Sequence, residues 1–120
     1  MLPEVNRLRQ RRDFKRIYQR GKSLALPCFV LYWYKNPKNE TRIGFSVSKK
    51  IGKAVARNHL KRRLRAIAKE QLTKFPSGYD YIFIVRTAAV TADYAALSKQ
   101  LVQALQKLAQ RSQNQPEQQA

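Results

Sequence analysis

The chain has 120 residues, 43% of them apolar, a length and composition that suit one folded domain with its own core. Its 25 Lys and Arg against 7 Asp and Glu give a formal net charge of +18, which favours a polyanionic partner. No apolar run approaches the roughly 18 residues that span a bilayer, no secretory signal is recognisable, and one cysteine forms neither an internal disulfide nor a zinc cluster. We therefore expect a cytoplasmic protein without membrane contact, with Cys28 buried as a small apolar residue.

The N-terminal part of the chain predicts one helix and two strands. Residues 1–12 are basic, show no period and are expected to be flexible. A helix is predicted over Asp13–Arg20, with Asp13 as its N-cap and Gly21 just beyond its end. Residues 23–34 and 41–48 alternate in side-chain character around a polar turn, and we expect them to pair as an antiparallel hairpin.

Beyond Gly52 the pattern becomes helical, and residues 55–73 predict the second helix. Its apolar stripe is Leu60, Leu64, Ile67 and either Ala68 or Gln71.

The remaining chain predicts a strand, a third helix and a tail. Residues 79–86 are almost continuously apolar, as in a buried central strand. Residues 92–110 predict a helix, and residues 111–120 are Gln-rich and expected to be disordered. The core stripe of this third helix is Tyr94, Leu97, Leu101, Leu105 and Leu108.

The order helix, strand, strand, helix, strand, helix predicts an α+β fold. We expect a two-layer α/β sandwich in which a small, mostly antiparallel central sheet of three to four strands carries three helices. Residues 1–110 would form a single RNA-binding domain, with 1–12 as its flexible basic N-terminus.

The acidic residues do not form a candidate active site. No two of them stand at a spacing that would bring them together on one element, and His59 has no acid within ten residues. The sequence therefore predicts no catalytic residue and no metal site in this chain. The acids are Glu4, Asp13, Glu40, Glu70, Asp80, Asp93 and Glu117.

The segment 48–65 holds eight Lys and Arg and no acid. Gly52 and the short side chains of Ala54 and Ala56 allow close backbone approach at the start of the helix. Helix N-termini attract phosphate through their free N–H groups and dipole.

Helical geometry gives this segment two faces. At about 100° per residue, one arc roughly 100° wide beside the leucine stripe collects the polar side chains. A solvated helix would carry interspersed acids for ion pairing along its surface, and none occurs before Glu70. The arc therefore favours a polyanion; its members are Asn58, Lys61, Arg62, Arg65 and Lys69.

Four aromatic residues are candidates for stacking on unpaired bases: Phe14, Tyr18, Tyr32 and Trp33. Cations surround the first two, and Tyr32 and Trp33 lie on opposite faces of one predicted strand. Each ring could instead simply fill the core, and the sequence leaves both interpretations open.

Residues 45–58, followed by Lys61, Arg62 and Arg65, resemble the signature of the protein subunit of bacterial ribonuclease P. Asp13-Phe14 and the stretch 29–32 also resemble that family, and the element order fits from about Arg7 to Ala109. Two positions depart from its pattern: His59 stands where Arg is usual, and Ala66 where an acid or amide is usual.

The resemblance implies a ribonucleoprotein that removes the 5′ leader from precursor tRNA. Its active site and catalytic Mg²⁺ would belong to the RNA subunit, so the protein itself would bind no cofactor and need no obligate protein partner. The resemblance also implies a left-handed strand–helix–strand crossover, whereas general topology rules predict a right-handed one.

Two sets of site residues follow. The residues expected to bind the catalytic RNA subunit are Lys49, Lys50, Lys53, Arg57, Asn58, Lys61, Arg62 and Arg65. The residues expected to bind the precursor-tRNA leader, in a cleft between the first helix and the sheet, are Phe14, Tyr18, Tyr32, Arg11 and Lys15.

Two other functions compete with this one. The first is an RNA-binding module without a catalytic assembly, such as a ribosomal protein or RNA chaperone. The second is a stand-alone nuclease, which the scattered acids disfavour.

We predict that sulfate and phosphate stabilise the fold, because anions bound to the native state reduce the self-repulsion of a chain at +18. An anion at 100 times its dissociation constant should add about 2.7 kcal/mol to the free energy of unfolding. Thermal melting in sulfate, compared with chloride at equal ionic strength, measures the effect. A melting temperature indifferent to the anion would contradict the prediction.

Overall fold

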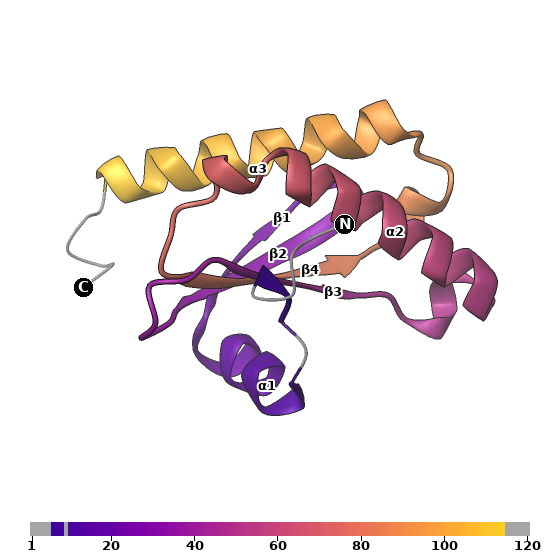
Figure 1. The fold of residues 1–120 in the computed structure, drawn as a ribbon. Helices are drawn as coiled ribbons and strands as arrows, with labels where there is room; N and C mark the ends of the chain where they lie inside the picture. The colour runs from indigo at the N-terminus through magenta and orange to yellow at the C-terminus, as the bar shows by residue number, and fades with distance from the viewer. Residues whose placement is uncertain (1–5, 9, 115–120) are drawn as a thin grey trace.

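The computed structural model describes residues 6–8 and 10–114, with side chains as far as residue 110. Three helices pack on a four-stranded sheet (Figure 1). The helices are α1 (Arg11–Arg20), α2 (Ala54–Glu70) and α3 (Tyr94–Asn114). The strands are β1 (Lys22–Ala25), β2 (Phe29–Lys35), β3 (Arg42–Ser46) and β4 (Tyr79–Val85). No helix within the described ranges is long and apolar enough to span a membrane.

The sheet has the order β1-β2-β4-β3. The pairs β1–β2 and β2–β4 are antiparallel, and β3 runs parallel to β4, so the predicted α+β class is confirmed. The predicted hairpin is wrong in two ways. Residues 23–34 form two strands joined at Leu26-Pro27-Cys28, and β4 separates β2 from β3. The apolar β4 takes the central place because both of its faces can then be buried.

Helices cover both faces of the sheet (Figure 1). On one face, α2 and α3 pack over the larger core, which includes Phe29, Leu31 and Phe83. On the other, α1 covers a smaller core of Leu8, Ile17 and Ile82. The expected two-layer sandwich thus describes the sheet with α2 and α3, and α1 adds a layer opposite. The expected left hand of the β3–α2–β4 crossover stays a prediction from the resemblance.

The helical stripes mostly bury as predicted. Leu60, Leu64 and Ile67 are buried on α2, and Ala68 completes the stripe rather than Gln71, whose side chain is only partly buried. On α3 the four leucines are buried, but Tyr94 is exposed. It stands at the first position of α3, where its hydroxyl donates to the Glu70 carboxylate at the end of α2.

Both chain ends hold more secondary structure than the sequence predicts wherever the structure describes them. Arg7 forms a parallel bridge with Ile43, Leu8 is buried and donates its N–H to the Ile43 carbonyl at 3.0 Å, and α1 begins at Arg11. The flexibility expected over 1–12 stays a prediction, and 1–5 and 9 lie outside the described part. Likewise α3 continues to Asn114, so the predicted tail is helical there, while 115–120 lie outside.

The ends of α1 differ from the predicted caps. Gln10 occupies the N-cap position, and Asp13 lies in the first turn, where its carboxylate pairs with arginines instead of capping the helix. Gly21 follows the helix in an extended conformation (φ −77°). Glycine is required there by space, since a Cβ would lie 2.5 Å from the Ile17 carbonyl oxygen and 2.6 Å from that of Trp33.

A buried acid joins β4 to its surroundings. The Asp80 carboxylate is fully buried and accepts two hydrogen bonds of 2.7 Å from Arg42, one to each oxygen. Asn36 Nδ2 donates at 3.0 Å and Arg16 Nη2 at 3.3 Å. Arg16 and Arg42 also reach Asp13 at 3.3 and 3.8 Å. Two acids and two arginines thus tie α1 and β3 to β4, and the Asp80 hydrogen bond raises the pKa of Arg42 above its ordinary value.

Replacing Asp80 should destabilise the fold more than replacing Asp13. Asp80→Asn leaves Arg42 facing a neutral, fully buried partner, and the loss should be about 3 kcal/mol. Asp13→Asn removes the same charge from a carboxylate whose contacts are longer, 3.3 and 3.8 Å, and should cost less than Asp80→Asn. Urea unfolding of both variants at one fixed sulfate concentration measures the difference, and equal losses would mean that net charge alone matters.

Candidate RNA-binding surfaces

The basic segment enters α2 through a short turn. A single turn of 3₁₀ helix, η2 (Lys49–Ile51), follows β3 and anchors Ile51 in the core. Gly52 then adopts φ +152°, a backbone conformation that residues with side chains rarely take. Lys53 occupies the N-cap of α2, so cations and no acid surround the positive end of the helix dipole.

The residues predicted to bind the RNA subunit lie on this turn and helix, and their side chains reach the surface to different extents. Arg57, Lys61 and Arg65 are half-buried, and Arg57 Nε donates to the Gly52 carbonyl at 3.1 Å, which directs its guanidinium back over the turn. The other five, Lys49, Lys50, Lys53, Asn58 and Arg62, are exposed.

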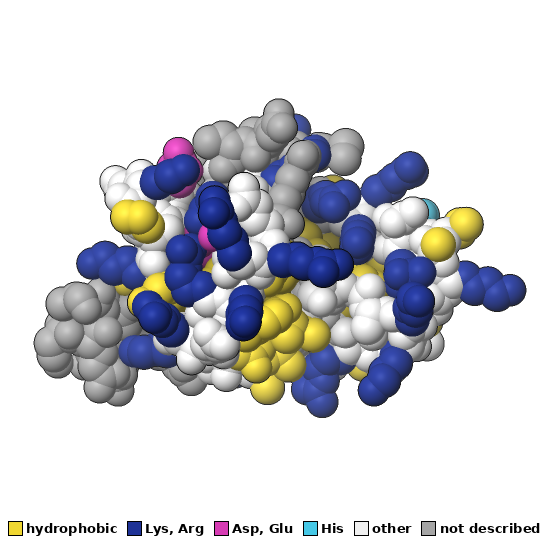
Figure 2. All heavy atoms as spheres, turned by 90° about the horizontal axis from the view of Figure 1, so that it is seen from below, with side chains coloured by type: hydrophobic (Ala, Val, Ile, Leu, Met, Phe, Trp, Pro, Cys, Tyr) yellow, Lys and Arg dark blue, Asp and Glu magenta, His cyan; other side chains and the backbone are white. Residues whose placement is uncertain are grey.

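A groove of about 610 Å³ runs along α1. Ser46, at the end of β3, closes its far side, so the groove lies between α1 and the sheet. Figure 2, seen from the α1 side, shows an apolar patch bordered by many Lys and Arg side chains and few acidic ones. The residues that line the groove are Arg11, Phe14, Lys15, Tyr18, Gln19 and Ser46.

Four of the five predicted leader residues therefore line one groove, and the fifth lies directly behind it. The ring centroids of Phe14 and Tyr18 are 6.3 Å apart, and Tyr18 meets Tyr32 edge to face at 5.2 Å. Burial raises the pKa of the Tyr18 phenol above 10.0, against the lowering effect of a hydrogen bond with Ser46. Trp33, in contrast, is buried in the core under α2 and α3, so for this ring core filling is the correct interpretation.

Gly44 shapes the groove, a role that the sequence pattern did not reveal. A Cβ at this β3 position would stand 2.7 Å from Phe14 Cζ and 3.1 Å from the Leu8 carbonyl oxygen. The bare glycine lets the Phe14 ring lie against the sheet, which holds that ring beside the groove. The alternation of residues 41–48 gives no sign of this contact, because Phe14 and Leu8 lie far away in the sequence.

The Asp80 network was also missed, and it alters the charge near the groove. Asp13 and Asp80 pair with Arg16 and Arg42, so these four charges balance within the fold. Arg11 and Lys15 are the exposed cations among the groove-lining residues and remain directed to solvent. A single acid in an apolar strand was the available signal for the network.

Known proteins resemble this chain over most of its length. The family model described as Ribonuclease P matches residues 2–109. The ribonuclease P protein component of Alkaliphilus oremlandii is 38% identical over 104 residues, covering 87% of this chain and 91% of that protein. That of Clostridium botulinum strain Loch Maree is 40% identical over 103 residues, covering 85% of this chain and 93% of that protein.

Solved structures agree with the sequence comparison. The RNase P protein of Staphylococcus aureus superposes with a TM-score of 0.78 at 34% identity, covering 88% of this chain and 96% of that one. The RNase P protein from Thermotoga maritima has the same TM-score at 36% identity, covering 84% and 96%.

Proposed function

The chain belongs to the ribonuclease P protein family, and on that premise we propose that it binds two RNAs at two separate surfaces. It is a protein component of ribonuclease P, and so a subunit of an endoribonuclease. The first surface, the cations of η2 and α2, would bind the catalytic RNA subunit. The second, the groove along α1, would bind the single-stranded 5′ leader of precursor tRNA.

The observation that carries the proposal is the groove itself. It brings exposed aromatic surface and two solvent-directed cations, Arg11 and Lys15, into one channel. Unpaired bases of any kind stack on aromatic rings, while cations bind the backbone phosphates. A single strand meets both requirements, whereas a duplex hides the faces of its bases.

The α2 surface suits a folded RNA better than a single strand. Its cations are spread over η2 and several turns of α2 with no Phe, Tyr or Trp among them, so this surface suits phosphate contacts better than the stacking of successive bases. Phosphate contacts of this kind supply affinity and register. By neutralising phosphates they should also lower the Mg²⁺ concentration that the RNA needs.

The division of labour follows from these two surfaces. Leader contacts favour precursor over mature tRNA, because only the precursor carries a leader. Cleavage and the catalytic Mg²⁺ ions would belong to the RNA subunit, in the cytoplasm, and this chain would supply binding and orientation.

Cleavage of precursor tRNA tests the proposal in three reactions: the protein alone, the RNA subunit alone at low Mg²⁺, and the two together. We expect cleavage at low Mg²⁺ only on mixing. Cleavage by the protein alone would indicate a nuclease, and no gain on mixing would favour a ribosomal protein, RNA chaperone or similar binding module.

Removing α2 cations should weaken RNA-subunit binding and flatten its salt dependence. For Arg57→Ala, Lys61→Ala or Arg62→Ala, the slope of log K against log salt should become shallower by about 0.7 to 0.9 for each phosphate that the variant no longer neutralises, because fewer counterions are released. Filter binding across a salt series measures the slopes. Lys107→Ala on α3 is the matched control, since it removes one exposed positive charge outside this surface; slopes that change equally for all variants would contradict the assignment.

Phe14→Ala should lower affinity for precursor tRNA about tenfold, as expected when one base loses its stacking partner, with little effect on mature tRNA. Dissociation constants of the holoenzyme for both tRNAs measure it. Tyr94→Ala removes an exposed aromatic ring outside the groove and should leave both constants unchanged. If Phe14→Ala weakened both tRNAs equally, the leader would not lie in this groove.

A further inference from the structure

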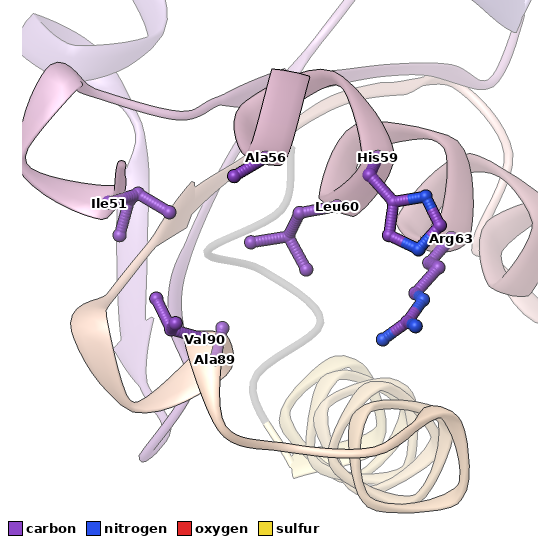
Figure 3. A pocket seen from close by; sticks show the side chains of 7 residues that line it. All are labelled: Ile51, Ala56, His59, Leu60, Arg63, Ala89 and Val90. Atoms are coloured by element: carbon purple, nitrogen blue, oxygen red, sulfur yellow. The ribbon is translucent and has the colours of Figure 1, made fainter. Parts of the chain in front are cut away.

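A second cavity lies on the flank of α2 away from the cationic arc. Its volume is about 210 Å³, and it opens between α2 and the short 3₁₀ helix η4 (Thr87–Val90), which follows β4. Figure 3 shows Ile51, Ala89 and Val90 on one side, His59 and Arg63 on the other, and Leu60 between them. None of the groove residues along α1 takes part in it.

The cavity has an apolar floor and a basic rim. Ile51, Leu60 and Ala89 are buried, and they form a surface that gains from contact with an apolar face. His59 and Arg63 stand one helical turn apart and present planar, nitrogen-bearing groups at the opening. Imidazole and guanidinium planes both stack on nucleobases.

The surroundings of the cavity favour RNA as its occupant. No acid occurs between Glu40 and Glu70, so the α2 side of the cavity carries only neutral and positive side chains. Beyond η4 the nearest acid in sequence is Asp93, whose carboxylate accepts the Ala96 N–H at 2.8 Å and so caps α3. No acid is among the residues that line the cavity, so a polyanion meets no negative side chain there.

The cavity is large enough for one flat ring system. An enclosed apolar cavity of roughly 150 Å³ is sufficient for a benzene ring, so about 210 Å³ accommodates one base. Val90, which lines the cavity, is 55% accessible, so part of the apolar lining faces solvent.

Helical geometry connects this cavity to the proposed RNA surface. His59 and Arg63 lie roughly 100° and 140° around α2 from Asn58, on the opposite side from Lys61. The solvent face of the helix, which includes Val55 and Arg62, lies between the cationic arc and the cavity. An RNA that lies across this face therefore reaches the cationic arc and the cavity together.

We propose that the cavity between α2 and η4 receives one unpaired nucleobase of the RNA subunit, stacked against His59 and Arg63. This rests on the proposed function, since it assumes that the RNA subunit binds α2. It also gives His59 a role: at this position an imidazole forms one wall of a base-sized site.

Filling the cavity tests the proposal without removing a cation. Ala56 lines the cavity from an exposed position on α2, so Ala56→Trp should occupy the space while the helix stays folded. Ala109→Trp makes the same change at an exposed α3 position outside both the cavity and the α2 surface. The probe is the ribonuclease P RNA encoded in the same genome, bound to the full chain, and circular dichroism melting checks each variant's fold.

We expect Ala56→Trp to weaken RNA binding about tenfold with an unchanged salt slope, and Ala109→Trp to bind like the unmodified chain. Dimethyl sulfate and a carbodiimide together report unpaired bases of all four kinds. At least one base protected in the unmodified and Ala109→Trp complexes should become reactive with Ala56→Trp. Equal affinity of the two tryptophan variants, or weaker binding with no newly reactive base, would overturn the proposal.

A second variant keeps the test decisive if Ala56→Trp unfolds. Arg63→Lys retains the charge but loses the planar group, so it should weaken binding severalfold at constant salt slope and expose the same base. Binding and reactivity like those of the unmodified chain would overturn the proposal. If Lys61→Ala and Arg62→Ala leave the salt slope unchanged, the α2 surface does not bind the RNA subunit, and the proposed function is wrong. If these two variants flatten the salt slope while the cavity variants have no effect, only the proposed base site is wrong.

Discussion

The Asp80 carboxylate is the contact on which the arrangement of this fold depends. It is fully buried at the start of the central strand, and Arg42 holds both of its oxygens at 2.7 Å. Arg16 brings α1 to the same acid, so the sheet and the helix that forms the groove wall share one charged centre. In a chain with a net charge of +18, most cations repel one another, and this centre uses two of them to build the fold. Exposed cations such as Arg11, Lys15 and Lys53 lie outside this centre.

Much of the local structure could be predicted because it follows from periodicity, whereas long-range pairing could not. The α2 stripe of Leu60 and Leu64 and the buried strand over 79–86 need only neighbouring residues for their identification. The hairpin prediction failed because alternation marks a strand without naming its partner, and β4 paired more favourably with both candidates. Tyr32 and Trp33 show the same limit, since the pattern placed them on opposite faces but could not say which face meets the larger core.

The candidate site could also be predicted only in part. The run of Lys and Arg without acids predicted a basic helix at α2 with exposed side chains, and Phe14 and Tyr18 do line one groove. Gly44 and the Asp80–Arg42 pair were missed, because each depends on a partner more than 25 residues away that no local pattern identifies. The cavity beside His59 depends in the same way on η4, which returns to α2 only after the whole of β4 has been formed.

The strand order has a consequence for the order of events during synthesis. β4 is the last strand in the chain and pairs with both β2 and β3, so the sheet cannot close until residue 85 has left the ribosome. By then η2 and α2 have already emerged, with their leucine stripe still lacking the surface that covers it. Contacts between distant segments slow folding, because loop closure must precede the stabilisation they provide. The nascent protein therefore presents its basic segment, unsupported by the sheet, to the RNA-rich surface of the ribosome before the domain is complete.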